Sequence, residues 1–175
     1  MTSAPKEAME QRQYLTFILS DEEYAISILQ VKEIIGYDTV TAVPKTPRWI
    51  RGVINLRGNV VPVVDLAIRF GMRERPVTKT SCIIIVEWRL ETQCILMGVM
   101  ADSVSQVMDI SSEDIRPVPA FGTLIKMDYL QGMAQMGKKF ALLLNIDKVL
   151  SADDVMGLEE ISTEKNGLRP STAPA

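Results

Sequence analysis

The sequence predicts a mainly-β protein, and three observations support this fold class. The chain has 175 residues, a length typical of one domain or of two small domains packed together. Apolar and polar residues alternate with a period of two along many short runs, which is the pattern of half-buried strands. Glycine, proline and acidic residues interrupt these runs at short intervals. About ten short strands with little helix indicate barrels or a sandwich.

The first half of the chain is predicted to form two hairpins with further extended runs between them. A polar turn at residues 20–23 joins the strands of the first hairpin, and residues 57–59 join the β-branched strands of the second. Pro44 and Pro47 exclude a regular helix between the hairpins. The predicted strands of this half are residues 14–19, 24–28, 31–35, 39–43, 52–56 and 60–64.

A short helix is predicted over residues 65–70, directly after the second hairpin. Asp65 is a favourable N-cap residue, good helix formers follow it, and Gly71 is a typical stop signal. The charged residues 72–80 are predicted to form a loop. The strands predicted for the second half are residues 81–88, 93–101, 102–110, 129–136 and 139–146, with a second helix beginning at Asp147.

One arrangement of residues occurs twice along the chain. Gly52 leads into a strand, a glycine-containing turn, a second strand and Asp65, and Gly132 leads through the same series to Asp147. The distance from glycine to aspartate is 13 residues in the first case (65 − 52) and 15 in the second (147 − 132). Two similar hairpin-plus-helix units predict two related barrels that cover each other's apolar faces.

Composition disfavours several classes of function. The net charge of −3 provides no basic excess for a polyanion, so nucleic acid is not expected as a partner. The chain contains no histidine, which removes histidine-based catalytic pairs and triads, HExxH zinc sites and phosphoacceptor histidines. Potential hard metal ligands are scattered, so neither a metal nor another cofactor is expected. The apolar runs are shorter than the roughly 20 residues that cross a bilayer.

The polar ends of the chain suggest tails around one folded unit. Residues 1–12 are expected to be a flexible N-terminal tail, residues 13–150 the folded domain, and residues 151–175 a helical start followed by a flexible tail. The N-terminus lacks the apolar stretch of a signal peptide, so a cytoplasmic location is expected. Cys82 and Cys94 lie in apolar runs and are expected to be buried free thiols.

Three aspartates stand where a catalytic carboxylate can lie, directly after an apolar strand. Asp65, Asp102 and Asp147 have this placement. Helix caps and turn residues occupy the same positions without any chemistry. Because the chain offers no histidine and no suggestive pair of carboxylates, structural roles are the favoured interpretation, and no catalytic residue is predicted.

Two polar positions within apolar strands have both a structural and a functional interpretation. Arg57 interrupts an apolar hairpin at its turn, either as a solvated turn residue or as a guanidinium presented to a partner. Glu33 is expected on the same side of an extended run as Val31 and Ile35. It marks either a half-buried sheet edge or the polar point of an apolar contact patch.

Taken together, these segments resemble the CheW family of chemotaxis coupling proteins. The resemblance covers about residues 14–150, and its most specific part is the seventeen-residue segment IRGVINLRGNVVPVVDL at residues 50–66. A match of this length and order is far more specific than a short motif. The other matching segments are residues 17–26, 28–34, 43–47, 102–107, 115–119 and 143–147.

The resemblance implies two SH3-like five-stranded β-barrels around a shared hydrophobic core, with short helices and no catalysis. It further implies an adaptor that couples the cytoplasmic tips of transmembrane chemoreceptors (methyl-accepting chemotaxis proteins) to the regulatory domain of the CheA histidine kinase. Such adaptors help to assemble signalling arrays, to which the cytoplasmic protein is recruited without inserting into the membrane. By position, the expected kinase contacts are Ile34, Arg116 and Phe121. The residues that match the family's receptor-facing groove are Val31, Glu33, Gly52, Asn55, Arg57, Gly58, Gly98 and Val107.

Three other functions compete with this interpretation. A scaffold of the same fold that serves a non-swimming chemosensory pathway, such as motility on surfaces, is compatible with every residue above. A small enzyme or ligand-binding barrel is disfavoured by the missing histidine and by the lack of a polar cluster. A barrel that binds single-stranded nucleic acid needs aromatic stacking platforms in a basic groove, whereas aromatic residues are 6% of this acidic chain.

Overall fold

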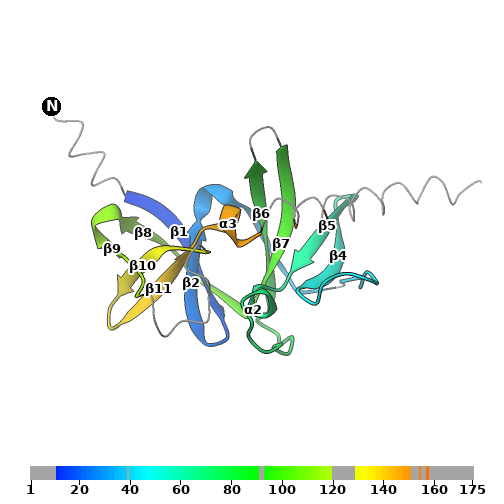
Figure 1. The fold of residues 1–175 in the computed structure, drawn as a ribbon, viewed down its shortest axis with the longest axis horizontal. Helices are drawn as coiled ribbons and strands as arrows, with labels where there is room; N and C mark the ends of the chain where they lie inside the picture. Colours follow the sequence, from blue (N-terminus) through cyan, green and yellow to red (C-terminus); the bar gives the residue numbers. More distant parts are fainter. Residues whose placement is uncertain are drawn as a thin grey trace, which may run out of the picture.

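The computed structural model describes residues 11–38, 40–90, 93–119 and 129–150, together with Asp154 and Gly157. Most of the described chain is β-structure, arranged as two sheets side by side (Figure 1). The predicted mainly-β fold with short helices is therefore confirmed. The first sheet contains β1 (Gln11–Leu19), β2 (Glu22–Ser27), β8 (Ser103–Ser111), β9 (Ile115–Arg116), β10 (Leu130–Met136) and β11 (Lys139–Leu144). The second contains β3 (Val31–Gly36), β4 (Ile50–Leu56), β5 (Asn59–Val64), β6 (Cys82–Leu90) and β7 (Gln93–Ala101).

Short helices connect the strands. The 3₁₀ turn η1 (Ile28–Gln30) links β2 to β3, and η2 (Ser112–Asp114) links β8 to β9. The helix α2 (Leu66–Arg69) follows β5, and α3 (Ile146–Val149) follows β11. The two α-helices, α2 and α3, therefore each complete one hairpin-plus-helix unit, as the sequence predicts.

Each sheet brings its two edges together. The six-stranded sheet has the order β8-β1-β2-β11-β10-β9, and the three residues of η2 are enough to link its two edge strands. The five-stranded sheet has the order β3-β6-β7-β5-β4, and Thr41, which follows the edge strand β3, bridges to Val53 on the opposite edge strand β4. A sheet whose edges meet in this way is a barrel. We call the six-stranded sheet barrel 1 and the five-stranded sheet barrel 2.

The strand count of barrel 1 differs by one from the expected five. The difference arises at η2, which interrupts one long bent strand and makes β8 and β9 separate elements. The predicted strand over residues 39–43 is also wrong for the described residues 40–43, which contain a single bridge at Thr41. Pro44 and the left-handed Lys45 (φ 64°) turn the chain away directly afterwards, so no ladder extends from this bridge.

The repeated arrangement seen in the sequence is a structural duplication. Gly52 and Gly132 both lie at a register shift in the hairpin of their barrel, with φ values of 147° and 158°. A Cβ atom on Gly52 would lie 2.1 Å from the Thr41 carbonyl oxygen, and one on Gly132 would lie 2.9 Å from that of Arg116. Both glycines therefore allow the chain at the opposite edge of the barrel to approach closely.

The duplication corrects one predicted equivalence. The residue that matches Asp65 is Asn145 rather than Asp147, since each is the N-cap of its helix. The Trp49 carbonyl accepts the Asp65 amide at 2.7 Å, and the Tyr129 carbonyl accepts the Asn145 amide at 2.8 Å. The distance from the glycine to the cap is therefore 13 residues in both units (65 − 52 and 145 − 132).

The core has three parts that follow the same duplication. A shared cluster lies between the barrels and contains residues of both, such as Leu15 of β1 and Ile84 of β6. A second cluster includes Leu143 in barrel 1, and a third includes Val61 in barrel 2. The shared core implied by the family resemblance is thus present. Four rings form a continuous series across the shared cluster, with centroids 5.5–6.2 Å apart: Phe17, Tyr24, Phe70 and Tyr129.

The two cysteines differ in burial. Cys82 at the start of β6 is buried, as expected, but Cys94 is exposed, so that part of the prediction is wrong. Cys94 pairs with Arg89 near the end of the β6–β7 hairpin, which projects beyond the rest of the barrel (Figure 1). A hydrogen bond to Glu87, together with desolvation, raises the pKa of the Cys94 thiol.

Candidate functional site

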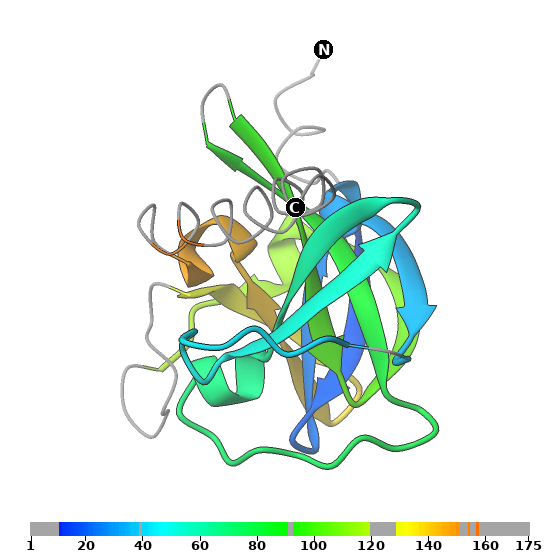
Figure 2. The same ribbon diagram turned by 90° about the vertical axis from the view of Figure 1, so that its right-hand side faces the viewer.

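An ion pair between Arg57 and Glu33 connects the two edge strands of barrel 2. Arg57 donates from Nη2 to the Glu33 carboxylate at 2.6 Å (Oε1) and 3.0 Å (Oε2). Glu33 lies on β3, and Arg57 lies in the turn between β4 and β5. Figure 2 shows the cyan β4–β5 hairpin on the face of barrel 2 that is turned toward the viewer. The Arg57 side chain is 72% exposed and that of Glu33 is 26% exposed, so the pair is accessible to a partner.

The turn that carries Arg57 is held in one shape by its neighbours. Arg57 and Gly58 both have left-handed backbones, with φ values of 52° and 89°, as a two-residue type I′ hairpin requires. The Asn55 Oδ1 atom accepts the Gly58 amide at 2.7 Å across this turn. Asn55 and Gly58 therefore fix the turn, while Glu33 fixes the guanidinium. Because a left-handed arginine is uncommon and costs energy, its presence here is consistent with a functional role.

Glu33 does not share a side of its strand with Val31, contrary to the sequence prediction. The β3–β6 register shifts between the two residues, so that Lys32 is an extra residue in the ladder. Val31 therefore packs against the shared cluster, whereas Ile35, on the same side as Glu33, packs against the interior of barrel 2. A sequence cannot reveal such a shift by period-two alternation alone.

Ile34 and Val107 occupy equivalent positions on the edge strands of the two barrels. Each stands two residues after the extra residue of a register shift, which is Lys32 in β3 and Ser105 in β8. Ile34 pairs with Ile84, and Val107 pairs with Leu15, and both of these partners belong to the shared cluster. Ile34 is 44% exposed and Val107 is 49% exposed. Each edge strand thus presents an apolar side chain on the side of its sheet that faces the shared core.

A weak sequence signal accompanies this equivalence. Residues 31–34 read VKEI and residues 104–107 read VSQV, so both contain valine, any residue, an acid or its amide, and a β-branched residue. The family resemblance implies different partners for Ile34 and Val107, whereas this short similarity indicates that the two positions are equivalent.

Two glycines of the predicted receptor-facing groove are buried in the wall of barrel 2. Gly52 lies against the Thr41 carbonyl, as described above. A Cβ atom on Gly98 would lie 2.6 Å from Cγ2 of Ile83, which belongs to the core of barrel 2. Both positions therefore require the absence of a side chain for packing, and neither presents a surface to a partner as Arg57 does.

The predicted kinase contacts do not form one group. Arg116 is an exposed residue of β9 and pairs with Met133 at the edge of barrel 1. Ile34 lies on barrel 2. Phe121 lies outside the described residues.

The strand-end aspartates have structural partners. Asp65 accepts the Ile68 amide at 3.3 Å and lies 3.8 Å from Arg51, and desolvation by burial raises its pKa. Asp102 accepts the Ser20 amide at 3.0 Å, and Asp147 accepts from the Gln30 side chain at 3.3 Å. In the described part of the chain, no three histidine, cysteine, aspartate or glutamate side chains gather as a metal site. No helix there is long and apolar enough to cross a bilayer.

Comparisons with known proteins identify the family. The CheW-like domain family model matches residues 13–154. The chain is 34% identical to Chemotaxis protein CheW of Klebsiella aerogenes, over 86% of this chain and 89% of that protein. It is 32% identical to Protein FrzA of Myxococcus xanthus, over 82% of this chain and 88% of that protein.

A solved structure supports the same assignment. The crystal structure of the scaffolding protein TtCheW from Thermoanaerobacter tengcongensis superimposes with a TM-score of 0.73 at 33% sequence identity, covering 82% of this chain and 90% of that one. The family-model match covers both barrels, since it begins in β1 and ends beyond α3. This chain belongs to the CheW-like domain family.

Proposed function

We propose that this protein is a non-catalytic adaptor that couples the cytoplasmic tips of chemoreceptors to the CheA histidine kinase. In this proposal it is a cytoplasmic protein that is recruited to receptor arrays at the membrane. The observation that carries the proposal is the accessible Arg57–Glu33 pair, which is held by a strained left-handed turn. A rigid, accessible charged pair that is not part of a catalytic group is suited to the recognition of a partner protein.

The receptor surface combines this pair with apolar side chains. A receptor tip is a helical hairpin, and a helix binds best where an apolar strip is accompanied by fixed polar points. Ile34 follows Glu33 on the edge strand β3 with its side chain on the opposite side of the sheet, and its equivalent Val107 is similarly exposed on β8. We therefore assign Ile34 to the receptor surface with Val107, instead of to the kinase. In this proposal Asn55 and Gly58 fix the turn that presents Arg57, Val31 packs against the shared cluster, and Gly52 and Gly98 act through packing.

The kinase contact is proposed at the β9 edge of barrel 1. Arg116 is exposed on β9 of barrel 1, so the kinase's regulatory domain would meet barrel 1 at this edge, together with Phe121. With receptor and kinase on different surfaces, the adaptor can stabilise one geometry of the kinase relative to the receptor. Its contribution is a difference in affinity between kinase-on and kinase-off arrangements.

The test is a reconstitution of kinase autophosphorylation with receptor-containing membranes. We expect the kinase rate to respond to receptor ligand only when this protein is added. Arg57→Ala and Glu33→Ala should weaken this response while direct kinase binding is kept, and Arg73→Ala, an exposed arginine of the loop after α2, is the matched control. A protein that stays folded but leaves the kinase rate unchanged contradicts the proposal.

A second pathway is supported by one comparison. The chain is similar to FrzA as well as to proteins named CheW, so the same adaptor chemistry can serve a non-swimming chemosensory system. Deletion of the gene distinguishes the two pathways, because loss of swimming responses alone supports the first and loss of surface movement alone supports the second.

A further inference from the structure

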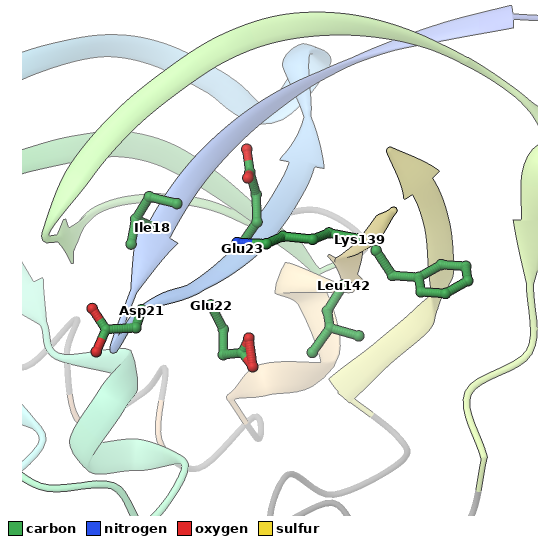
Figure 3. A pocket seen from close by; sticks show the side chains of 7 residues that line it. Ile18, Asp21, Glu22, Glu23, Lys139 and Leu142 are labelled. Carbon is green, nitrogen blue, oxygen red and sulfur yellow. The ribbon is translucent and has the colours of Figure 1, made fainter. Parts of the chain in front are cut away.

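A groove of about 390 Å³ opens on barrel 1 between the β1–β2 hairpin and β11 (Figure 3). It exists because β2 and β11 run parallel but pair only at Tyr24 with Leu142 and at Ala25 with Leu143. Both strands begin before these pairs, β2 at Glu22 and β11 at Lys139. Their first residues therefore separate and form the two walls of the groove.

The groove carries an excess of negative charge. Asp21, Glu22 and Glu23 line one wall, and Lys139 lines the other, which leaves an excess of two negative charges (three minus one). Asp21 lies 3.7 Å from Arg75 at the turn. Among the described residues, no ion pair includes Glu22, Glu23 or Lys139. Figure 3 shows the carboxylates of Glu22 and Glu23 directed to opposite sides of β2.

Apolar side chains accompany these charges. Phe140 is 41% exposed, one of the few large apolar residues of the described chain with this exposure. Ile18 and Leu142 contribute partly buried aliphatic surface to the same groove. A pocket for a small apolar ligand is lined predominantly by hydrophobic residues, whereas here charged side chains supply four of the seven lining residues. A polypeptide with both kinds of side chain fits this lining better.

Barrel 2 shows that the fold does not require these charges. Ala25 and Gly98 are equivalent, because each pairs with the strand residue opposite the bulge glycine of its barrel. The positions that match Glu22 and Glu23 are therefore Ile95 and Leu96. Ile95 is 8% exposed and belongs to the shared cluster, and Leu96 packs against the core of barrel 2. The same two strand positions thus hold a buried and a partly buried apolar residue in barrel 2, and an exposed and a partly exposed carboxylate in barrel 1.

We propose that this groove binds an extended segment of a partner protein in which lysine or arginine side chains flank a large apolar residue. The flanking cations pair with the carboxylates of Glu22 and Glu23 on the two sides of β2, and the apolar side chain packs on Phe140 and Leu142. Charge complementarity selects this occupant over an acidic or neutral segment. None of the residues that line the groove belongs to the proposed receptor surface, which includes the Arg57–Glu33 pair on barrel 2 and Val107 on β8 of barrel 1. Occupation of the groove is therefore compatible with receptor binding, and it adds a partner beyond the proposed function.

The test uses the full 175-residue chain and three labelled peptides, the basic GKFKLKG, the acidic GEFELEG and the neutral GSFSLSG. Fluorescence anisotropy gives their dissociation constants, and NMR of the ¹⁵N-labelled protein locates their binding. We expect only the basic peptide to bind, with shifts at the Glu22, Glu23 and Phe140 amides. Added salt should weaken this binding because the pairing charges are exposed.

Two variants and their controls complete the test. The double variant Glu22→Gln/Glu23→Gln should weaken the basic peptide about tenfold and remove most of its salt dependence, and Phe140→Ala should weaken it at every salt concentration. Glu113→Gln/Asp114→Asn on η2 and Val77→Ala, which alter exposed residues outside the groove, should leave it unchanged.

Each other outcome overturns the proposal. Equal binding of the three peptides, no shift at the groove amides, or equal losses in the control variants would each exclude a groove that is selective for a basic segment. If the groove amides shift when the protein alone is concentrated, the occupant is a second copy of this chain and the proposed partner is wrong.

Discussion

Arg57 donates to Glu33 at 2.6 Å from a backbone held at φ 52°, so an uncommon conformation and an exposed ion pair coincide at one residue. Placing an L-residue in this region costs roughly 1–2 kcal/mol. An exposed ion pair returns about 0–1 kcal/mol. Arg57 therefore contributes little or no net stability to the fold, as is expected of a residue that is retained for binding.

The variant Arg57→Asn separates the two roles. Asparagine before Gly58 forms the Asn-Gly dipeptide that type I′ turns favour, so we expect the free energy of unfolding to stay equal or to rise by about 0.5–1 kcal/mol. Receptor-dependent activation of the kinase should nevertheless fall as it does for Arg57→Ala. Urea-induced unfolding and the reconstituted kinase assay measure the two effects. Full coupling by a stable Arg57→Asn protein would show that the guanidinium is not used.

The shared cluster predicts that both barrels unfold together. Leu143 lies in the core of barrel 1, whereas Trp88 on β6 and Trp49 before β4 are carried by barrel 2 and pack in the shared cluster. We expect Leu143→Ala to lower the free energy of unfolding by about 2–5 kcal/mol. The transition seen by tryptophan fluorescence should move with the one seen by circular dichroism. Val61→Ala in barrel 2 should move both signals together as well. Separate transitions for the two probes would mean that each barrel is its own cooperative unit.

The strands were predictable because their hairpins alternate and end in recognisable turns. Arg57-Gly58 and the N-cap Asp65 are local signals, and the structure confirms the elements that they delimit. The extra residue Lys32 carries no such signal, because a register shift depends on the partner strand. For the same reason the sequence placed Val31 and Glu33 on one side.

The site was only partly accessible to sequence reasoning. The family resemblance selected Glu33 and Arg57 separately, and the structure joins them. Ile34 and Val107 are 73 residues apart (107 − 34), and their equivalence follows only from the pairing of each edge strand. The sequence favours Asp147 as the counterpart of Asp65, because aspartate is a common helix cap. Only the hydrogen bond that is repeated in both barrels shows that the counterpart is Asn145.

Gly98 provides a test of packing against recognition. A methyl group at this position would meet Ile83 at 2.6 Å and Val63 at 3.5 Å, so Gly98→Ala should cost about 1–3 kcal/mol through overpacking. In barrel 1 the residue equivalent to Gly98 is Ala25. Its partner on β1 is Thr16, whereas the partner of Gly98 on β6 is the larger Ile85. Thermal unfolding and receptor binding at a temperature where the variant is folded measure the two effects. A fold of normal stability with weaker receptor binding would assign Gly98 directly to the interface.

The buried cap Asp65 predicts a pH dependence of stability. Desolvation raises its pKa above the ordinary value of 3.8, so ionisation is less favourable in the folded chain than in the unfolded chain. The contribution of Asp65 to the stability of the folded chain therefore falls as the pH rises through the raised pKa. Asparagine caps helices as well as aspartate does and does not ionise, so Asp65→Asn should gain stability relative to the wild type between about pH 4 and 7.

The reverse exchange in barrel 1 is the matched control. Asn145→Asp introduces a carboxyl at the equivalent, partly buried cap, so this variant should lose stability relative to the wild type over the same pH range. Urea-induced unfolding of the three proteins from pH 3 to pH 7 gives both differences. The Asp65→Asn difference should grow with pH, and the Asn145→Asp difference should grow with the opposite sign. A difference for Asp65→Asn that is constant with pH, or that falls, would mean that Arg51 at 3.8 Å compensates fully for the burial of this carboxylate.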